Sequence, residues 1–128
     1  MRVFKTRVFN RWARRESVAD EELCKAVAEM RKGLVDAQLG SGVYKKRVAR
    51  AGEGKRGGYR VILATNLRER WFFMFGFAKN ERDNVDEDEL KMLKQLAAAL
   101  LGMKDPGIEK AKERGELVEI DCDKQETA

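Results

Sequence analysis

Two apolar stretches joined by a short turn constrain the fold of this chain more than any other feature. Residues 59–65 (YRVILAT) are rich in β-branched side chains, and residues 70–78 (RWFFMFGFA) are dense in aromatic ones. Side chains of both kinds favour extended strands, and the aromatic stretch is apolar enough to require cover on both faces. Residues 66–69 predict a hairpin turn. The sequence therefore predicts an antiparallel hairpin whose second strand is central in a sheet.

Further strands are predicted on either side of this hairpin in the chain. Residues 43–50 form a strand whose even-numbered and odd-numbered positions alternate between the two faces. Residues 51–58 contain four glycines and predict a turn or loop before the hairpin. Residues 2–5 predict a short first strand. Together these segments predict a mostly antiparallel, twisted sheet of about four strands.

Helices are predicted before and after the sheet strands. Residues 8–13 and 23–30 repeat apolar side chains at helical spacing, which predicts two N-terminal helices packed on the sheet. Ser17 with Asp20 predicts the start of the second helix, and Gly33 predicts its end. Residues 90–101 predict a C-terminal helix, with Asn84 as its N-cap, Glu87 as the reciprocal partner of that cap, and Gly102 at its end. The predicted fold class is α+β.

The cysteines and the missing histidines limit the chemistry of the chain. There are two cysteines and no histidine, which excludes Ser-His-Asp and Cys-His nucleophiles and a standard zinc site. Cys24 is interpreted as a buried apolar side chain, and Cys122 as incidental in a polar tail that is disordered after residue 121. We expect no metal and no cofactor. With no secretion signal and no apolar run near 20 residues, we expect a cytoplasmic protein without a membrane segment.

Basic residues are gathered in the middle of the chain. The net charge is +5, and residues 44–60 hold seven basic side chains against one acidic one. Such a balance favours a polyanionic partner. If the strands form an antiparallel meander, Lys55, Arg60 and Lys79 converge on one concave surface, with Tyr59 as a candidate for stacking on a base. The alternative is that Lys45 and Lys46 are ordinary solvated charges.

Three segments resemble the RelE/HigB-type toxins of bacterial type II toxin–antitoxin systems, in the RelE/ParE superfamily: residues 44–50 (YKKRVAR), 54–62 (GKRGGYRVI) and 75–84 (FGFAKNERDN). The resemblance covers residues 1–102 as one toxin domain and leaves residues 103–128 as a C-terminal extension, partly flexible. It implies a ribosome-dependent mRNA endoribonuclease, independent of metal, that acts in the ribosomal A site. It also implies a helix-turn-helix antitoxin as partner, and contact with operator DNA only through that antitoxin.

The resemblance assigns roles to particular residues. Lys55 and Arg60 match cations that contact the scissile phosphate, and Lys79 matches a basic position at the end of the last core strand. The expected RNA-binding residues are Lys45, Arg47, Arg56, Tyr59, Asn80 and Arg82. Relatives that carry a tyrosine or histidine near positions 79–82 differ from this chain, so the general base stays open among Lys79, Lys55 and Glu81. The alternatives to the nuclease are a non-hydrolytic ParE-like gyrase inhibitor and an RNA-binding module.

Overall fold

The computed structural model describes residues 1–50 and 54–123, with the backbone alone at 54–56. In this part of the chain it contains, in order, β1 (Arg2–Thr6), α1 (Arg7–Arg15), α2 (Asp20–Arg31), β2 (Ala37–Gly40), β3 (Val43–Arg50), β4 (Gly54–Thr65), β5 (Arg70–Ala78), α3 (Glu87–Leu101), α4 (Asp105–Glu113) and β6 (Leu117–Ile120). The predicted α+β class is confirmed. The prediction of about four strands is wrong, because the described residues form a sheet of six.

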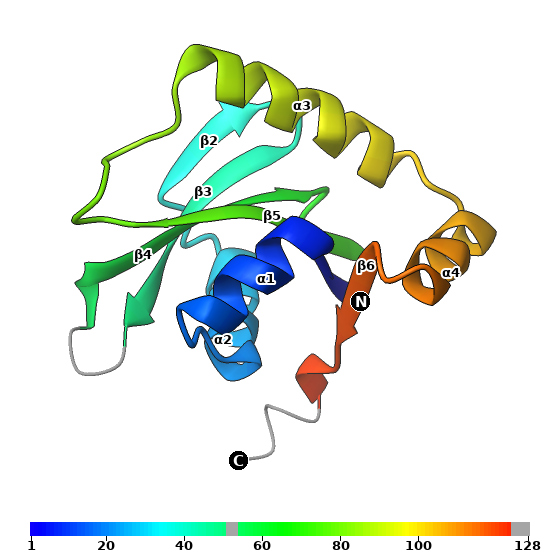
Figure 1. Ribbon diagram of the computed structural model, residues 1–128, viewed down its shortest axis with the longest axis horizontal. Coiled ribbons are helices and arrows are strands. Elements are labelled where there is room, and N and C mark those ends of the chain that lie inside the picture. The colour runs from blue at the N-terminus through cyan, green and yellow to red at the C-terminus, as the bar shows by residue number, and fades with distance from the viewer. Residues whose placement is uncertain (51–53, 124–128) are drawn as a thin grey trace.

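The six strands lie in the order β2-β3-β4-β5-β1-β6 (Figure 1). The predicted meander is confirmed, since β3, β4 and β5 are consecutive antiparallel neighbours. β1 lies beside β5 and runs parallel to it, and β6 pairs antiparallel with the other side of β1. The two strands beyond the predicted four are β2 and β6. Each has four residues, and they form the two edges of the sheet.

Helices cover both faces of the sheet. α1 and α2 pack on one face, and α3 with α4 packs on the other (Figure 1). Side chains alternate between these two cores along β4, where Val61 and Leu63 face α1 and α2 while Ile62 and Ala64 face α3. The aromatic strand β5 is buried on both faces, as its composition predicted. None of the helices in the described residues has the length and apolar composition of a membrane-spanning segment.

Two of the predicted helix starts are wrong in detail. α3 begins after Asp86, which accepts from the backbone N–H of Glu89 in a reciprocal capping box, two residues later than the predicted pair of Asn84 and Glu87. Both pairs have the same spacing, so the sequence pattern does not distinguish them. α2 begins after Ala19 without a side-chain cap, and Ser17 instead occupies a turn with a positive φ of 58°.

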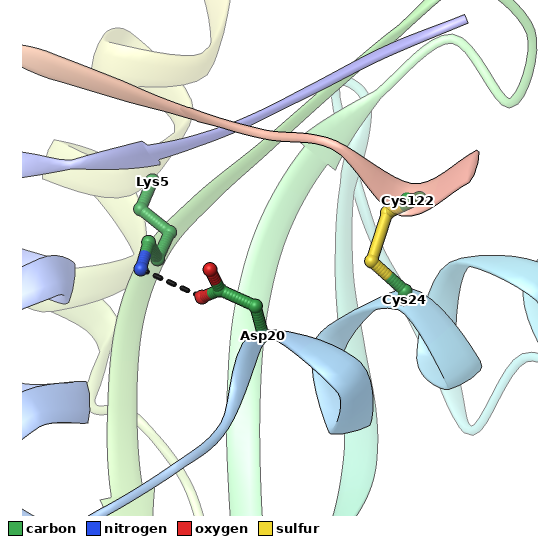
Figure 2. The surroundings of a disulfide bond; sticks show 4 residues. All are labelled: Lys5, Asp20, Cys24 and Cys122. Atoms are coloured by element: carbon green, nitrogen blue, oxygen red, sulfur yellow. Dashed lines mark hydrogen bonds and ion pairs between the residues drawn. A yellow bond between two sulfur atoms is a disulfide. The ribbon is translucent and has the colours of Figure 1, made fainter. Parts of the chain in front are cut away.

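The structure corrects the interpretation of both cysteines. Cys24 on α2 and Cys122, just after β6, form a disulfide between residues 98 positions apart (Figure 2). Cys122 is 4% exposed, so residues 122 and 123 do not belong to a disordered tail. The pairing of Val3 with Ile120 places the end of β6 on the α2 side of the sheet. The disulfide therefore fastens the last strand to the second helix.

Ion pairs join the first strand to distant parts of the chain. The buried Lys5 on β1 donates to Asp20 at the start of α2, with 2.8 Å between Nζ and Oδ1 (Figure 2). At the other end of β1, Arg2 binds Glu119 on β6 with 2.9 Å between nitrogen and oxygen, and Lys112 on α4 approaches the same carboxylate to 2.8 Å. These contacts hold α4 and β6 on the sheet. The division after Gly102 stays a prediction.

Reducing the disulfide is expected to destabilise the fold. A cross-link that closes so long a loop restricts the unfolded chain, and its loss is expected to lower the free energy of unfolding by about 2–5 kcal/mol. Urea unfolding of the wild type with and without dithiothreitol measures this difference. The double variant Cys24→Ala/Cys122→Ala is the control, and its stability should match the reduced wild type and ignore the reductant. Equal stability of oxidised and reduced wild type would contradict the expectation.

The Glu119 ion pairs are expected to make stability depend on pH. The hydrogen bond from Arg2, aided by Lys112, lowers the pKa of Glu119 from 4.5 to about 2. A carboxylate whose pKa falls on folding stabilises the protein above its ordinary pKa, and this contribution is lost as the pH falls from 4.5 towards 2. Glu119→Gln should therefore lower the free energy of unfolding by about 1–3 kcal/mol at pH 7 and by little at pH 2. Urea unfolding over this pH range tests it, with the exposed Glu113→Gln as the matched control.

Candidate functional site

The register of the meander aligns two arginines and an aromatic residue across the α3 face of the sheet. Arg47 on β3 is opposite Arg60 on β4, and Arg60 is opposite Phe77 on β5. Two positions along, Lys45 is opposite Ile62. Ile62 and Phe77 belong to the core beneath α3, so the alternation of the strands places these cations on the same face. The structure therefore places Lys45, Arg47 and Arg60 on one face, whereas the set predicted from the meander was Lys55, Arg60 and Lys79.

Arg60 is an unusual cation because it is 6% exposed and lies beside another arginine. Its guanidinium donates to the backbone carbonyl of Tyr59 at 3.3 Å. Burial, and after it the charge of Arg47, lower the pKa of Arg60, while the carboxylates of Asp36 and Asp83 act in the opposite direction. A cation whose charge is disfavoured in this way gains from a bound anion. The arrangement is suited to holding a phosphate group.

Arg47 and Lys46 lie on opposite faces and have different surroundings. The half-exposed Arg47 pairs with Asp36, which also accepts from its backbone N–H at 2.8 Å. Lys46 points to the α2 face, where it is 4% exposed and pairs with Glu29 at 2.9 Å. Lys46 is therefore not a solvated charge but a buried link between β3 and α2. Asp36 lies between α2 and β2, and no sequence pattern singled it out.

Lys79 and Asn80 follow β5 directly and are exposed. The backbone N–H of Lys79 donates to the carbonyl of Gly58 at 3.1 Å, which extends the β4–β5 ladder by one residue. Strand alternation continued from Phe77 puts position 79 on the Arg60 side of the sheet. In the described part of the chain, the side chain of Lys79 makes no ion pair. It is an accessible cation at the rim of the arginine row.

Arg82 fastens the loop after β5 to α3. Its guanidinium lies over the rings of Phe75 and Phe77, at 5.7 and 5.3 Å from their centroids, and it forms an ion pair with Glu89. The hydrogen bond with Glu89 raises the pKa of Arg82 and lowers that of Glu89. This side chain lies near the arginine row, but a carboxylate already holds it.

Tyr59 is not brought together with the arginine row. It faces α1 and α2, is 3% exposed, and donates its hydroxyl to the carbonyl of Glu16 at 3.1 Å. The ring of Trp12 meets it edge-on at 5.2 Å. Its parity on β4 is opposite to that of Arg60, so it is a core residue and we omit it from the candidate site. The side chains of Lys55 and Arg56 lie outside the described residues.

Acidic and thiol side chains do not form a metal site in this part of the molecule. Over residues 1–50 and 54–123, no group of three or more Asp, Glu, Cys or His side chains is placed to hold a metal ion.

The chain matches a known protein family. The family described as the RelE toxin of the RelE/RelB toxin–antitoxin system matches residues 1–120, from β1 to the end of β6. No curated protein sequence matches the chain.

Replacing Arg82 is expected to loosen the loop that carries Lys79. Arg82→Ala removes both the ion pair with Glu89 and the ring contacts, so amide hydrogen exchange over residues 79–86 should accelerate. Because the ion pair is near the surface, the free energy of unfolding should fall by no more than about 1 kcal/mol. Hydrogen exchange followed by mass spectrometry measures the loop, with Arg82→Lys expected to be intermediate. Unchanged exchange in the loop of Arg82→Ala would contradict this role.

Proposed function

The chain belongs to the RelE toxin family, and we propose that it is a ribosome-dependent endoribonuclease that cleaves mRNA in the ribosomal A site. Family membership makes it the toxin of a toxin–antitoxin system. The observation that carries the finer proposal is the burial of Arg60 next to Arg47, with the accessible Lys79 at the rim. The anion that such a row of cations would bind is a phosphodiester of the RNA backbone.

The proposed reaction is attack of a 2′-hydroxyl on the adjacent phosphate. The 2′-oxygen forms a bond to phosphorus, the 5′-oxygen leaves, and the products are a 2′,3′-cyclic phosphate and a 5′-hydroxyl. Negative charge grows on the phosphate oxygens in the transition state. The planar guanidinium of Arg60 donates to those oxygens from a site where burial strengthens the interaction. Arg47 adds charge from the neighbouring strand.

A proton must leave the 2′-hydroxyl and another must reach the 5′-oxygen. Lys79 is our candidate for a proton-transfer group because it is accessible and lies on the side of the sheet that carries Arg60. Glu81 and Lys55 are the other candidates. Proton-transfer groups that include no histidine benefit most when the ribosome holds the substrate in line for attack. This is a physical reason for dependence on the ribosome. We propose that no metal or cofactor takes part.

The family also implies the protein's partners. We propose that a cognate antitoxin with a helix-turn-helix domain binds and neutralises the toxin. Contact with operator DNA would then occur only through the antitoxin. The setting for this activity is the cytoplasm, where translating ribosomes supply the mRNA.

Arg60→Ala is expected to abolish growth arrest and to slow mRNA cleavage by about 100- to 1000-fold, the usual cost of losing one transition-state donor. Primer extension on translated mRNA after induction measures the cuts. Circular dichroism checks that the variant is folded.

Arg68→Ala is the matched control, because Arg68 is exposed in the β4–β5 turn at the far end of these strands. It should cleave like the wild type. A folded Arg60→Ala variant that cleaves normally removes Arg60 from the site. DNA damage signalling without mRNA cuts by the wild type would contradict the nuclease and favour the gyrase inhibitor, whereas RNA binding without cuts would favour the binding module.

A further inference from the structure

A cleft lies beside the site, where β5 loses its strand neighbour. β1 pairs with β5 only as far as Phe73, and α1 lies along the remainder of this edge within the described residues. Between α1, β5 and the loop after β5 is a cavity of about 460 Å³. A volume in this range is enough for one small ligand. The cleft is separate from the row formed by Arg47 and Arg60, since neither arginine lines it.

The walls of the cleft combine flat apolar surfaces with charges. Trp12 from α1 and Phe75 from β5 line it, together with Arg11, Arg15 and Glu81. The indole of Trp12 lies tightly against β5, since a Cβ at Gly76 would overlap its ring atoms. The strand thus holds the indole in place at the cleft.

The arginines on α1 have two different surroundings: one binds the end of α4, and others line the cleft. Arg7 donates to the carbonyls of Arg114 and Gly115 at the end of α4, at 2.7 and 3.2 Å. Arg11 and Arg15 are exposed and line the cleft. Arg15 approaches only Glu16, at 3.9 Å, and Arg11 makes no ion pair or hydrogen bond in the described part of the chain. Both cations are available to a ligand.

Phe77 connects the cleft to the arginine row. It is the neighbour of Arg60 across the β4–β5 ladder, and it also lines the cleft. Adjacent strands lie about 4.8 Å apart. Phe77 is buried beneath the guanidinium of Arg82, so a chain that leaves the arginine row passes over Arg82 to reach the cleft. This continuity favours an extended ligand that occupies both places over two unrelated small molecules.

We propose that the cleft is a second RNA subsite, which binds one nucleotide next to the one being cleaved. Its base lies against Trp12 and Phe75, and its phosphate lies on Arg11 and Arg15. Aromatic surfaces with arginines are the usual means of holding single-stranded RNA. This inference rests on the proposed function, because it assumes that the arginine row holds RNA.

The test compares Arg11→Ala/Arg15→Ala with Arg14→Ala, a matched control on the exposed side of the same helix that does not line the cleft. Binding of a short single-stranded RNA oligonucleotide is measured by fluorescence anisotropy over a range of salt concentrations. The double variant should bind about tenfold more weakly, and its slope of log affinity against log salt should be shallower by about 0.7, the value for one phosphate that is no longer neutralised. Arg14→Ala should behave like the wild type.

Intrinsic fluorescence gives a second readout, because Trp71 is fully buried and Trp12 lines the cleft. Oligonucleotide binding should quench Trp12 in the wild type. Unchanged affinity and salt slope in Arg11→Ala/Arg15→Ala, or no quenching at saturating RNA, would overturn the inference even if Arg60→Ala still abolishes cleavage. Failure of the wild type to cleave would instead overturn the proposed function.

The RNA of the ribosome itself presents the same chemistry, so a second arm measures binding to ribosomes without mRNA. Loss of affinity by Arg11→Ala/Arg15→Ala for the oligonucleotide supports the flanking nucleotide of the cleaved strand. If the double variant loses affinity only for ribosomes without mRNA, that assignment is overturned and the cleft binds ribosomal RNA instead.

Discussion

The pairing register of β3, β4 and β5 determines what the rest of the molecule can do. Because successive side chains alternate between faces, the placement of Arg60 between Arg47 and Phe77 puts both cations on the α3 side and sends Tyr59 into the opposite core. A shift of β4 by one residue would exchange the two sets. The apolar residues that alternate with the cations oppose such a shift, since both cores would lose them.

Two opposing demands meet at Arg60. Burial and the charge of Arg47 disfavour the charged form of Arg60, whereas the carboxylates of Asp36 and Asp83 favour it. The same surroundings make a bound phosphate favourable. Stability is supplied elsewhere, by the two cores, by the disulfide between Cys24 and Cys122 and by the ion pairs of β1. Contacts far from Arg60 thus stabilise the sheet that carries this buried cation.

Local patterns in the sequence predicted most of the fold, and long-range contacts account for what they missed. Strand periodicity identified the β3–β4–β5 meander, and helical spacing identified the helices. The helix cap at Asp86 was misplaced because two positions offered equivalent pairs. The disulfide to Cys122, the parallel pairing of β1 with β5 and the pairing of β1 with β6 depend on segments far apart in the chain. In the candidate site, the meander predicted that Arg60 and Lys79 share a face, whereas the pairing of Arg47 with Arg60 depends on the register, and Arg11 in the cleft depends on how α1 packs.

The position of β1 has a consequence for how the protein is made. This strand is synthesised long before both of its neighbours in the sheet, β5 and β6. Contacts between such distant segments form slowly because a long loop must close first. The strands β3, β4 and β5 can pair through local contacts before β1 pairs with its neighbours. In a nascent chain β1 therefore stays unpaired until β5 and β6 have been made, and a product that stops short of β6 leaves one edge of β1 bare.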